Sequence, residues 1–144
     1  MIGAWIEWMD YSKLSALIVE DIEAAASTYA SMLEQIGFGD IQTASDGLNA
    51  IETLETLKAD LVLCDYTMPY LNGLELIAAI RTGLTAAPTD TPFILMTGHA
   101  DNAKIRAAAW LSAQDFAMKP IAFDHLAAMI EHAITHRPKI DHAL

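Results

Sequence analysis

Short apolar segments alternate with longer segments of helical periodicity from residue 13 to residue 136 of the chain. Three of the short segments, residues 14–19, 60–64 and 93–96, are apolar almost throughout. A strand has this composition when both of its faces are buried, as in parallel sheets covered by helices on both sides. The alternation therefore predicts an α/β domain in which a parallel sheet lies between two layers of helices.

The pattern predicts five strands and five helices. Gly37 follows the first helix and is typical of the left-handed position that ends a helix. In the second helix, Leu48, Ile51, Leu54 and Leu57 recur at helical spacing, and we expect them on one face. The predicted strands are residues 14–19, 41–44, 60–64, 93–96 and 115–118, and the predicted helices are residues 22–36, about 47–57, 74–81, 100–111 and 123 to about 136.

The length of the chain fits one domain. It has 144 residues, of which 53% are hydrophobic, and this is enough for a single core. We expect the domain over residues 13–137, an apolar N-terminal extension over residues 1–12 and a tail over residues 138–144. The extension contains Trp5 and Trp8. Two interpretations of it stay open: a segment that folds back onto its own domain, or a patch for a partner or a dimer.

Charge and cysteine content narrow the possible functions. The net charge of −11 repels phosphate backbones, which argues against direct binding of DNA or RNA. Cys64 is the single cysteine, so an internal disulfide and a multi-cysteine zinc site are excluded. No apolar run approaches the ~20 residues of a membrane-spanning helix, and the N-terminus lacks the pattern of a signal peptide. We therefore expect a cytoplasmic protein with no membrane or nucleic-acid partner.

Acidic residues follow two of the predicted strands. Glu20 and Asp21 come directly after the first strand, and Asp65 stands at the end of the third. In an open parallel sheet, functional groups gather beyond the carboxyl ends of the strands. Two unit charges about 4 Å apart repel by roughly 4 kcal/mol at an effective dielectric of about 20. If these strands are neighbours, the cluster needs a cation, and its hard oxygen ligands suit Mg²⁺.

A hydroxyl and an ammonium group follow two later strands. Thr97 comes after the fourth strand and Lys119 after the fifth. The hydroxyl can donate to one phosphoryl oxygen, and the ammonium can neutralise another. Together with the carboxylates and a metal ion, they describe a phosphoryl-accepting site with Asp65 as the nucleophile. Each residue also has an ordinary interpretation: Asp21 and Thr97 as helix caps, Asp65 as a turn residue and Lys119 as a surface charge.

The order and spacing of these residues resemble those of response-regulator receiver domains over residues 13–136. The matching segments are Glu20-Asp21, Asp65-Tyr66-Thr67-Met68-Pro69, Gly73, Thr97-Gly98 and Lys119-Pro120. The resemblance implies a flavodoxin-like doubly wound sheet with the strand order 2-1-3-4-5. It also implies that a histidine kinase or a histidine phosphotransfer protein phosphorylates Asp65.

The resemblance assigns the metal-binding roles. Asp65 would accept the phosphoryl group and also bind Mg²⁺. Asp21 would be a direct ligand, and Glu20 would bind the ion directly or through water. Thr67 would contribute only its backbone carbonyl.

The resemblance also implies a phosphorylation switch. Lys119 would pair with Asp65 before phosphorylation and with the phosphoryl group afterwards, and Pro120 would follow a cis peptide bond. Thr97 would move toward the phosphoryl group and Phe116 would turn inward behind it. This movement would remodel the surface formed by the fourth helix, the fifth strand and the fifth helix. Phe116 also has the ordinary interpretation of a core aromatic residue.

Two further residues have implied effects on the lifetime of the phosphorylated form. The resemblance implies that the side chains of Thr67 and His99 tune dephosphorylation. His99 lies two residues beyond Thr97, and its alternative is an ordinary surface histidine.

We therefore predict a phosphorylation-controlled module that binds a downstream protein as a monomer or weak homodimer, and not a turnover enzyme. One alternative is a phosphorylation-independent scaffold that uses the N-terminal extension. Another is a haloacid-dehalogenase-like phosphatase, but that family needs a second Asp where Thr67 stands. No G-x-G-x-x-G or P-loop motif supports nucleotide binding.

Overall fold

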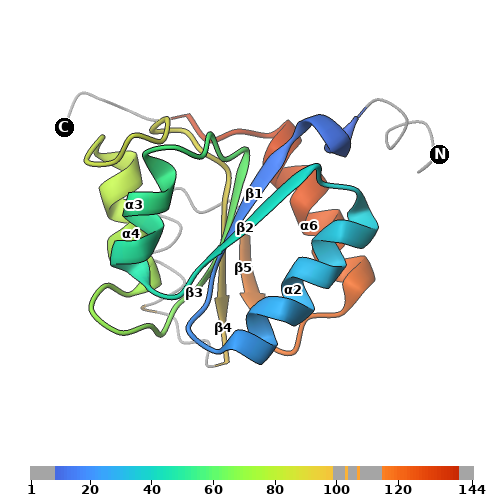
Figure 1. Ribbon diagram of the computed structural model, residues 1–144, viewed down its shortest axis with the longest axis horizontal. Helices are drawn as coiled ribbons and strands as arrows, with labels where there is room; N and C mark the ends of the chain where they lie inside the picture. Colours follow the sequence, from blue (N-terminus) through green and yellow to red (C-terminus); the bar gives the residue numbers. More distant parts are fainter. Residues whose placement is uncertain (1–8, 99–102, 104–106, 108–114, 140–144) are drawn as a thin grey trace.

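The computed structural model describes residues 9–98, 103, 107 and 115–139. Within them lies a sheet of five parallel strands in the order β2-β1-β3-β4-β5 (Figure 1). This is the flavodoxin-like order that the resemblance implied. The bounds are β1 Ser15–Val19, β2 Asp40–Ala44, β3 Leu61–Asp65, β4 Phe93–Thr97 and β5 Asp115–Met118, and all five strands were predicted to within one residue at each end.

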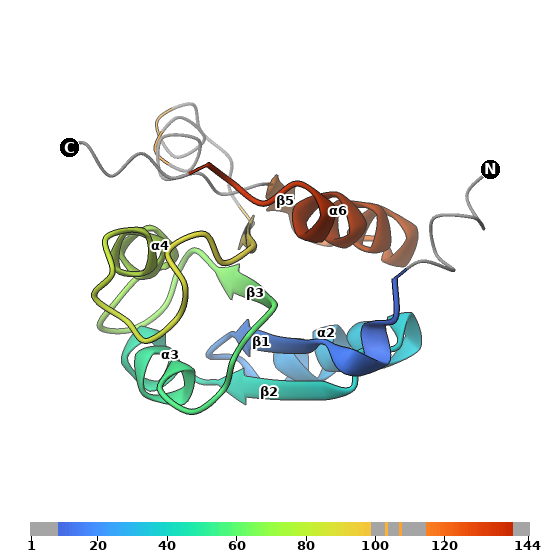
Figure 2. The same ribbon diagram turned by 90° about the horizontal axis from the view of Figure 1, so that it is seen from above.

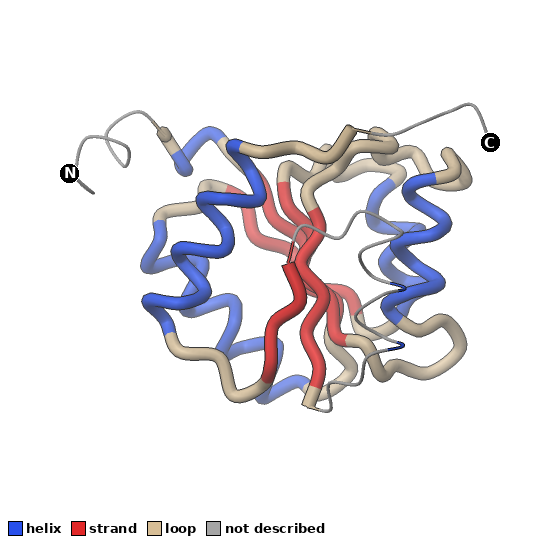
Figure 3. Tube along the Cα trace, turned by 180° about the vertical axis from the view of Figure 1, so that it is seen from behind, coloured by secondary structure: helices blue, strands red, loops and turns tan. Residues whose placement is uncertain are grey.

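Helices cover both faces of the sheet. Helices α2 and α6 lie on one face and α3 and α4 on the other (Figures 1 and 2), and from behind the strands again form a layer between helices (Figure 3). The side chains of β1 divide between two cores: Leu17 and Val19 pack with α3 and α4, whereas Ala16 and Ile18 pack with α2 and α6. The bounds are η1 Tyr11–Lys13, α2 Glu23–Ile36, α3 Gly47–Leu54, α4 Gly73–Arg81 and α6 Phe123–Thr135.

The central strands are buried on both faces. Every residue of β3 and β4 is buried, and so is β1 after its first residue. Because successive side chains point to opposite faces, each of these strands must be apolar at nearly every position. This burial confirms the interpretation of the continuous apolar runs.

The end of α2 also follows the prediction. Gly37 has a φ of 114°, in the left-handed region, and its N–H donates to the carbonyl of Leu33 at 3.0 Å. A residue without a Cβ adopts this conformation at little cost.

The prediction for the second helix is wrong in two respects. Helix α3 ends at Leu54, before the expected end, and its buried residues are Gly47, Ala50 and Leu54. Leu48 is 55% exposed. The reason is that Gly47 faces the β3–α4 loop, where an added Cβ would lie 2.5 Å from the Cβ of Leu71. Each helical residue is rotated by about 100° from the previous one, so Leu48 points away from this contact.

The two ends of the chain are described in part. Tyr11 packs against Phe38 with ring centroids 5.1 Å apart, so the last part of the expected extension lies on the domain. Trp5, Trp8 and most of the predicted helix over residues 100–111 lie outside the described residues. The interpretations of the extension therefore stay predictions. In the described part of the chain, no helix is long and apolar enough to cross a bilayer.

Gly39 gives a test of the packing at the start of β2. Its N–H donates to the carbonyls of Tyr11 and Leu14, and an added Cβ would lie 1.9 Å from the carbonyl oxygen of Ser12. We expect Gly39→Ala to lower the free energy of unfolding by about 1–3 kcal/mol, measured by urea denaturation. Gly98→Ala is the control, because no described atom lies within 4 Å of its added Cβ. Equal stability of the two variants would contradict this packing.

Candidate functional site

The carboxyl ends of four strands bring together most of the residues singled out in the sequence. Glu20 follows β1, Asp65 ends β3, Thr97 ends β4 and Lys119 follows β5. Strand β3 lies between β1 and β4, and β4 pairs with β5. Because all the strands are parallel, these four residues share one edge of the sheet.

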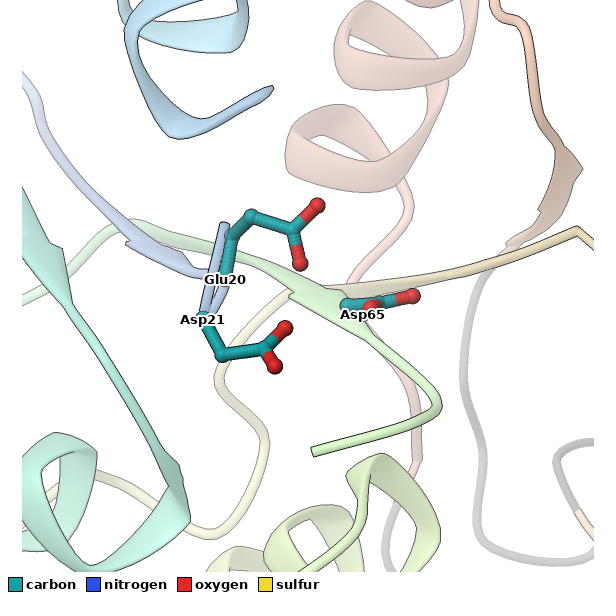
Figure 4. A group of neighbouring side chains, drawn as sticks. All are labelled: Glu20, Asp21 and Asp65. Atoms are coloured by element: carbon teal, nitrogen blue, oxygen red, sulfur yellow. The ribbon is translucent and has the colours of Figure 1, made fainter. Parts of the chain in front are cut away.

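Three carboxylates meet at this edge. One oxygen each of Glu20, Asp21 and Asp65 lies within 4.8 Å of the others, and Figure 4 shows the three side chains around a common space. Glu20 and Asp65 are buried, whereas Asp21 is exposed. The predicted convergence of the carboxylates is thus present in the structure.

Lys119 joins two of these carboxylates. Its Nζ atom lies 3.0 Å from Oε1 of Glu20 and 3.1 Å from Oδ1 of Asp65. Its backbone N–H donates to the carbonyl of Thr97 at 2.8 Å, and the bond to Pro120 is cis, as expected. The sequence predicted the pair with Asp65 but missed the one with Glu20.

Burial and pairing shift two pKa values at the site. Burial raises the pKa of Glu20 to about 7, the neighbouring Asp65 raises it as well, and the hydrogen bond from Lys119 opposes both effects. Burial acts to lower the pKa of Lys119, but its contacts with Glu20 and Asp65 outweigh burial and raise that pKa overall. The ammonium is therefore held in its charged form between the two acids.

The second carboxylate oxygen of Glu20 is a candidate ligand for a cation. Oε2 is buried without a hydrogen-bond partner among the described residues. An unsatisfied buried acceptor is costly, and a cation bound between these carboxylates would satisfy it. Hard oxygen ligands of this kind fit Mg²⁺. Glu20, Asp21 and Asp65 could therefore hold a magnesium ion.

The loop after Asp65 is held by the start of α4. Asn72 and Glu75 form a reciprocal capping box, with hydrogen bonds of 2.9 and 3.0 Å. An added Cβ on Gly73 would lie 2.7 Å from the carbonyl oxygen of Asp65, so only glycine allows this approach. Thr67 is exposed in this loop, two residues beyond Asp65. Thr67 thus follows Asp65 in a loop that starts at the same edge of the sheet.

Thr97 and Phe116 lie on the same face of the sheet. Leu95 pairs with Phe116 across β4 and β5, and Thr97 stands two residues beyond Leu95. Thr97 is buried, and Phe116 is half-buried against the core beneath α3 and α4. The two residues of the expected switch are therefore neighbours on one face. His99 lies outside the described residues.

Sequence reasoning missed the conformation of Tyr70, which it treated only as part of a turn. Tyr70 has a φ of 69° and is 82% exposed. No sequence signal indicated this, because left-handed positions favour Gly and Asn over aromatic residues.

Comparison with known proteins identifies the family. The sequence profile of the response regulator receiver domain matches residues 16–131. The chain therefore belongs to the response-regulator receiver domains, and it is of the CheY-like type. It is 30% identical over 119 residues to a probable chemotaxis protein CheY of Rhizobium etli, an alignment that covers 83% of this chain and 91% of the relative.

Two other comparisons show how widely this domain is used. The regulatory protein LuxO of Vibrio vulnificus is 32% identical over 123 residues, which cover 85% of this chain and 26% of LuxO. The receiver domain of the sensor histidine kinase PA1611 from Pseudomonas aeruginosa PAO1 has a TM-score of 0.74 at 23% identity, with 85% of this chain and 98% of that chain covered. That structure contains a magnesium ion in its active-site cleft. At this identity the likeness shows the fold.

The raised pKa of Glu20 gives a test of the site's electrostatics. Its ordinary value is 4.5 and its value in the folded chain is about 7, so the unfolded chain loses this proton first as pH rises. The free energy of unfolding should then fall between these pH values. We expect Glu20→Gln to remove this loss and to stabilise the metal-free protein at pH 7.5 by on the order of 1 kcal/mol, measured by thermal unfolding with a chelator present.

Glu23→Gln is the matched control, because Glu23 is exposed in the first turn of α2. Adding Mg²⁺ should raise the melting temperature of the wild type more than that of Glu20→Gln. If the free energy of unfolding depends on pH in the same way for the wild type and for Glu20→Gln, the raised pKa of Glu20 is wrong.

Proposed function

We propose that Asp65 accepts a phosphoryl group from the phosphohistidine of a histidine kinase or a histidine phosphotransfer protein, with Mg²⁺ as cofactor. The observation that carries this proposal is the position of Lys119, whose ammonium lies 3.1 Å from the Asp65 carboxylate at the centre of the acidic cluster. The ammonium, together with a cation held by the two neighbouring acids, would offset the negative charge of a phosphoryl group that arrives at Asp65.

Each residue has a distinct task in the transfer. The Asp65 side chain is 10% exposed, so a donor reaches it from the sheet edge only. Its carboxylate oxygen attacks phosphorus, and Lys119 neutralises the phosphoryl oxygens that arrive. The Thr97 hydroxyl donates to one of them. The protein thus contributes mainly position and charge.

Mg²⁺ would be held by Asp21, Asp65 and the backbone carbonyl of Thr67, with Glu20 as a ligand directly or through water. The unpartnered oxygen of Glu20 and the magnesium ion in the related PA1611 receiver domain support this assignment. When bound, the ion would neutralise the repulsion between carboxylates and phosphoryl group.

The output of phosphorylation is a change of protein-binding surface. Thr97 moves toward the phosphoryl group and Phe116 follows, which remodels the surface of β5 and α6 for a downstream protein. Most of the fourth helix expected for this surface lies outside the described residues. Thr67 and His99 tune dephosphorylation. The domain acts in the cytoplasm as a monomer or weak homodimer, and it is a signalling substrate and not a turnover enzyme.

Intact-protein mass spectrometry tests this function. Incubation with acetyl phosphate and Mg²⁺ should add one phosphoryl group, about 80 Da, to the wild type. The adduct should be absent from Asp65→Asn and should be lost with a chelator, because the acceptor and the metal site are both required. Asp60→Asn is the matched control, since Asp60 lies at the opposite end of β3. A folded wild type that gains no adduct would favour the phosphorylation-independent scaffold.

A further inference from the structure

The exposed large apolar side chains gather at the edge that carries Asp65. Five such residues are exposed in the described part of the chain. Four of them lie at this edge, and we call them the apolar rim: Ile22, Leu48, Tyr70 and Met118, which are 58%, 55%, 82% and 49% exposed. The fifth, Leu84, is 77% exposed and follows the end of α4, at the opposite edge of the sheet.

Three residues of the rim lie close along the chain to groups already described. Gly47 contacts Leu71 so closely that an added Cβ would lie 2.5 Å from the Cβ of Leu71. Leu48 and Tyr70 are the chain neighbours of this pair, so they belong to two segments whose backbones meet where α3 packs against the β3–α4 loop. Ile22 follows Asp21, whose carboxylate belongs to the acidic cluster (Figure 4). The rim therefore borders the acidic cluster directly.

Tyr70, a residue of the rim, has an energetically unfavourable backbone conformation. It is the one non-glycine residue with positive φ in the described part of the chain. For an ordinary L-residue this left-handed conformation costs roughly 1–2 kcal/mol. The ring is 82% exposed, so burial of the ring in the core does not offset the cost. Strain of this kind, in a loop next to reactive groups, indicates a functional constraint on the ring's position.

Among the described residues, Lys119 is the one lysine or arginine at this edge. The exposed acids Asp21, Glu23, Glu75 and Asp124 all follow the carboxyl ends of strands. The other described lysines and arginines lie at the opposite edge, before strands or after helices: Lys13, Lys58, Arg81, Arg137 and Lys139. Lys119 itself is paired with Glu20 and Asp65. A protein that covers this edge must therefore match an apolar rim with apolar groups and the surrounding acids with basic ones.

We propose that the apolar rim is the docking surface for the protein that donates the phosphoryl group, with Tyr70 as its main contact and a determinant of donor specificity. This inference rests on the proposed function. The partner is a protein face that presents a phosphohistidine among apolar side chains, with lysine or arginine around them. In the transfer, the P–N bond of phosphohistidine breaks, a P–O bond to Asp65 forms, and the freed imidazole nitrogen takes up a proton from water.

The donor is favoured over other occupants because of where Asp65 lies. Its side chain is only 10% exposed, so a histidine that reaches it brings the surrounding protein surface onto the rim. A small phosphodonor such as acetyl phosphate brings no protein surface that would cover the rim. The rim should therefore matter for a protein donor and not for a small one.

This difference gives the experiment. Histidine kinase cores and phosphotransfer proteins, each purified and carrying a radioactive phosphoryl group on histidine, are tested as a panel. The one that labels the wild type fastest is the protein probe, and acetyl phosphate is the small one. Tyr70→Asn removes the ring, and asparagine tolerates the left-handed conformation. We expect it to slow transfer from the protein probe at least tenfold and to leave acetyl phosphate labelling within twofold.

Leu84→Asn is the matched control, an equally exposed apolar residue outside the rim, and both rates should be unchanged. Leu48→Gln, at an exposed helical position, should repeat the effect of Tyr70→Asn and covers the case in which that variant does not fold. Unchanged transfer from the protein probe, or an equal loss with both donors, would overturn the proposal. The proposal is also overturned if acetyl phosphate labels the wild type but no protein of the panel transfers a phosphoryl group to it. If acetyl phosphate fails to label the wild type, the proposed function itself is wrong.

Discussion

The Lys119 ammonium, shared between two carboxylates, is the interaction on which the site depends. It lies 3.0 Å from Glu20 and 3.1 Å from Asp65, and both acids are largely withdrawn from solvent. Two such negative charges a few ångströms apart repel strongly in a protein environment. One ammonium compensates only part of the charge of three acids, and Glu20 keeps an oxygen with no partner among the described residues. The site is therefore built to take a further cation, and with it a phosphoryl group.

The parallel sheet makes this arrangement possible. Because the strands are parallel, Glu20, Asp65, Thr97 and Lys119 all lie at one edge of the sheet. Side chains alternate between the two faces along each strand, and this alternation determines which core each residue faces. The loops that leave this edge are held by close contacts, such as Gly73 against the carbonyl of Asp65. The β3–α4 loop also carries Tyr70, whose side chain is exposed at this edge. The sheet topology therefore positions both the reactive groups and the surface around them.

Sequence predicts the parts that depend on local pattern. Continuous apolar runs indicated the central strands, and residues at strand ends indicated the cluster, because period and order along the chain determine both. Contacts between segments that are distant in the sequence could not be predicted from local patterns. The pairing of Lys119 with Glu20 depends on side-chain reach across two strands, and the exposure of Leu48 depends on which helical face meets Leu71. Tyr70 adopts a left-handed conformation that tyrosine rarely has, so the residue type did not indicate it.

The central claim is that Lys119 and the acids form a charge system that reorganises around a phosphoryl group. The most direct measurement is a crystal structure with Mg²⁺ and beryllofluoride, which mimics a phosphoryl group on aspartate. The account predicts beryllofluoride on Asp65, Mg²⁺ bound by Asp21 and Asp65, and the Lys119 ammonium moved from Glu20 to a fluorine atom. Beryllofluoride and Mg²⁺ bound at this site, with Lys119 still on Glu20, would contradict the role of Lys119. Failure of both to bind at crystallographic concentrations would contradict the account as a whole.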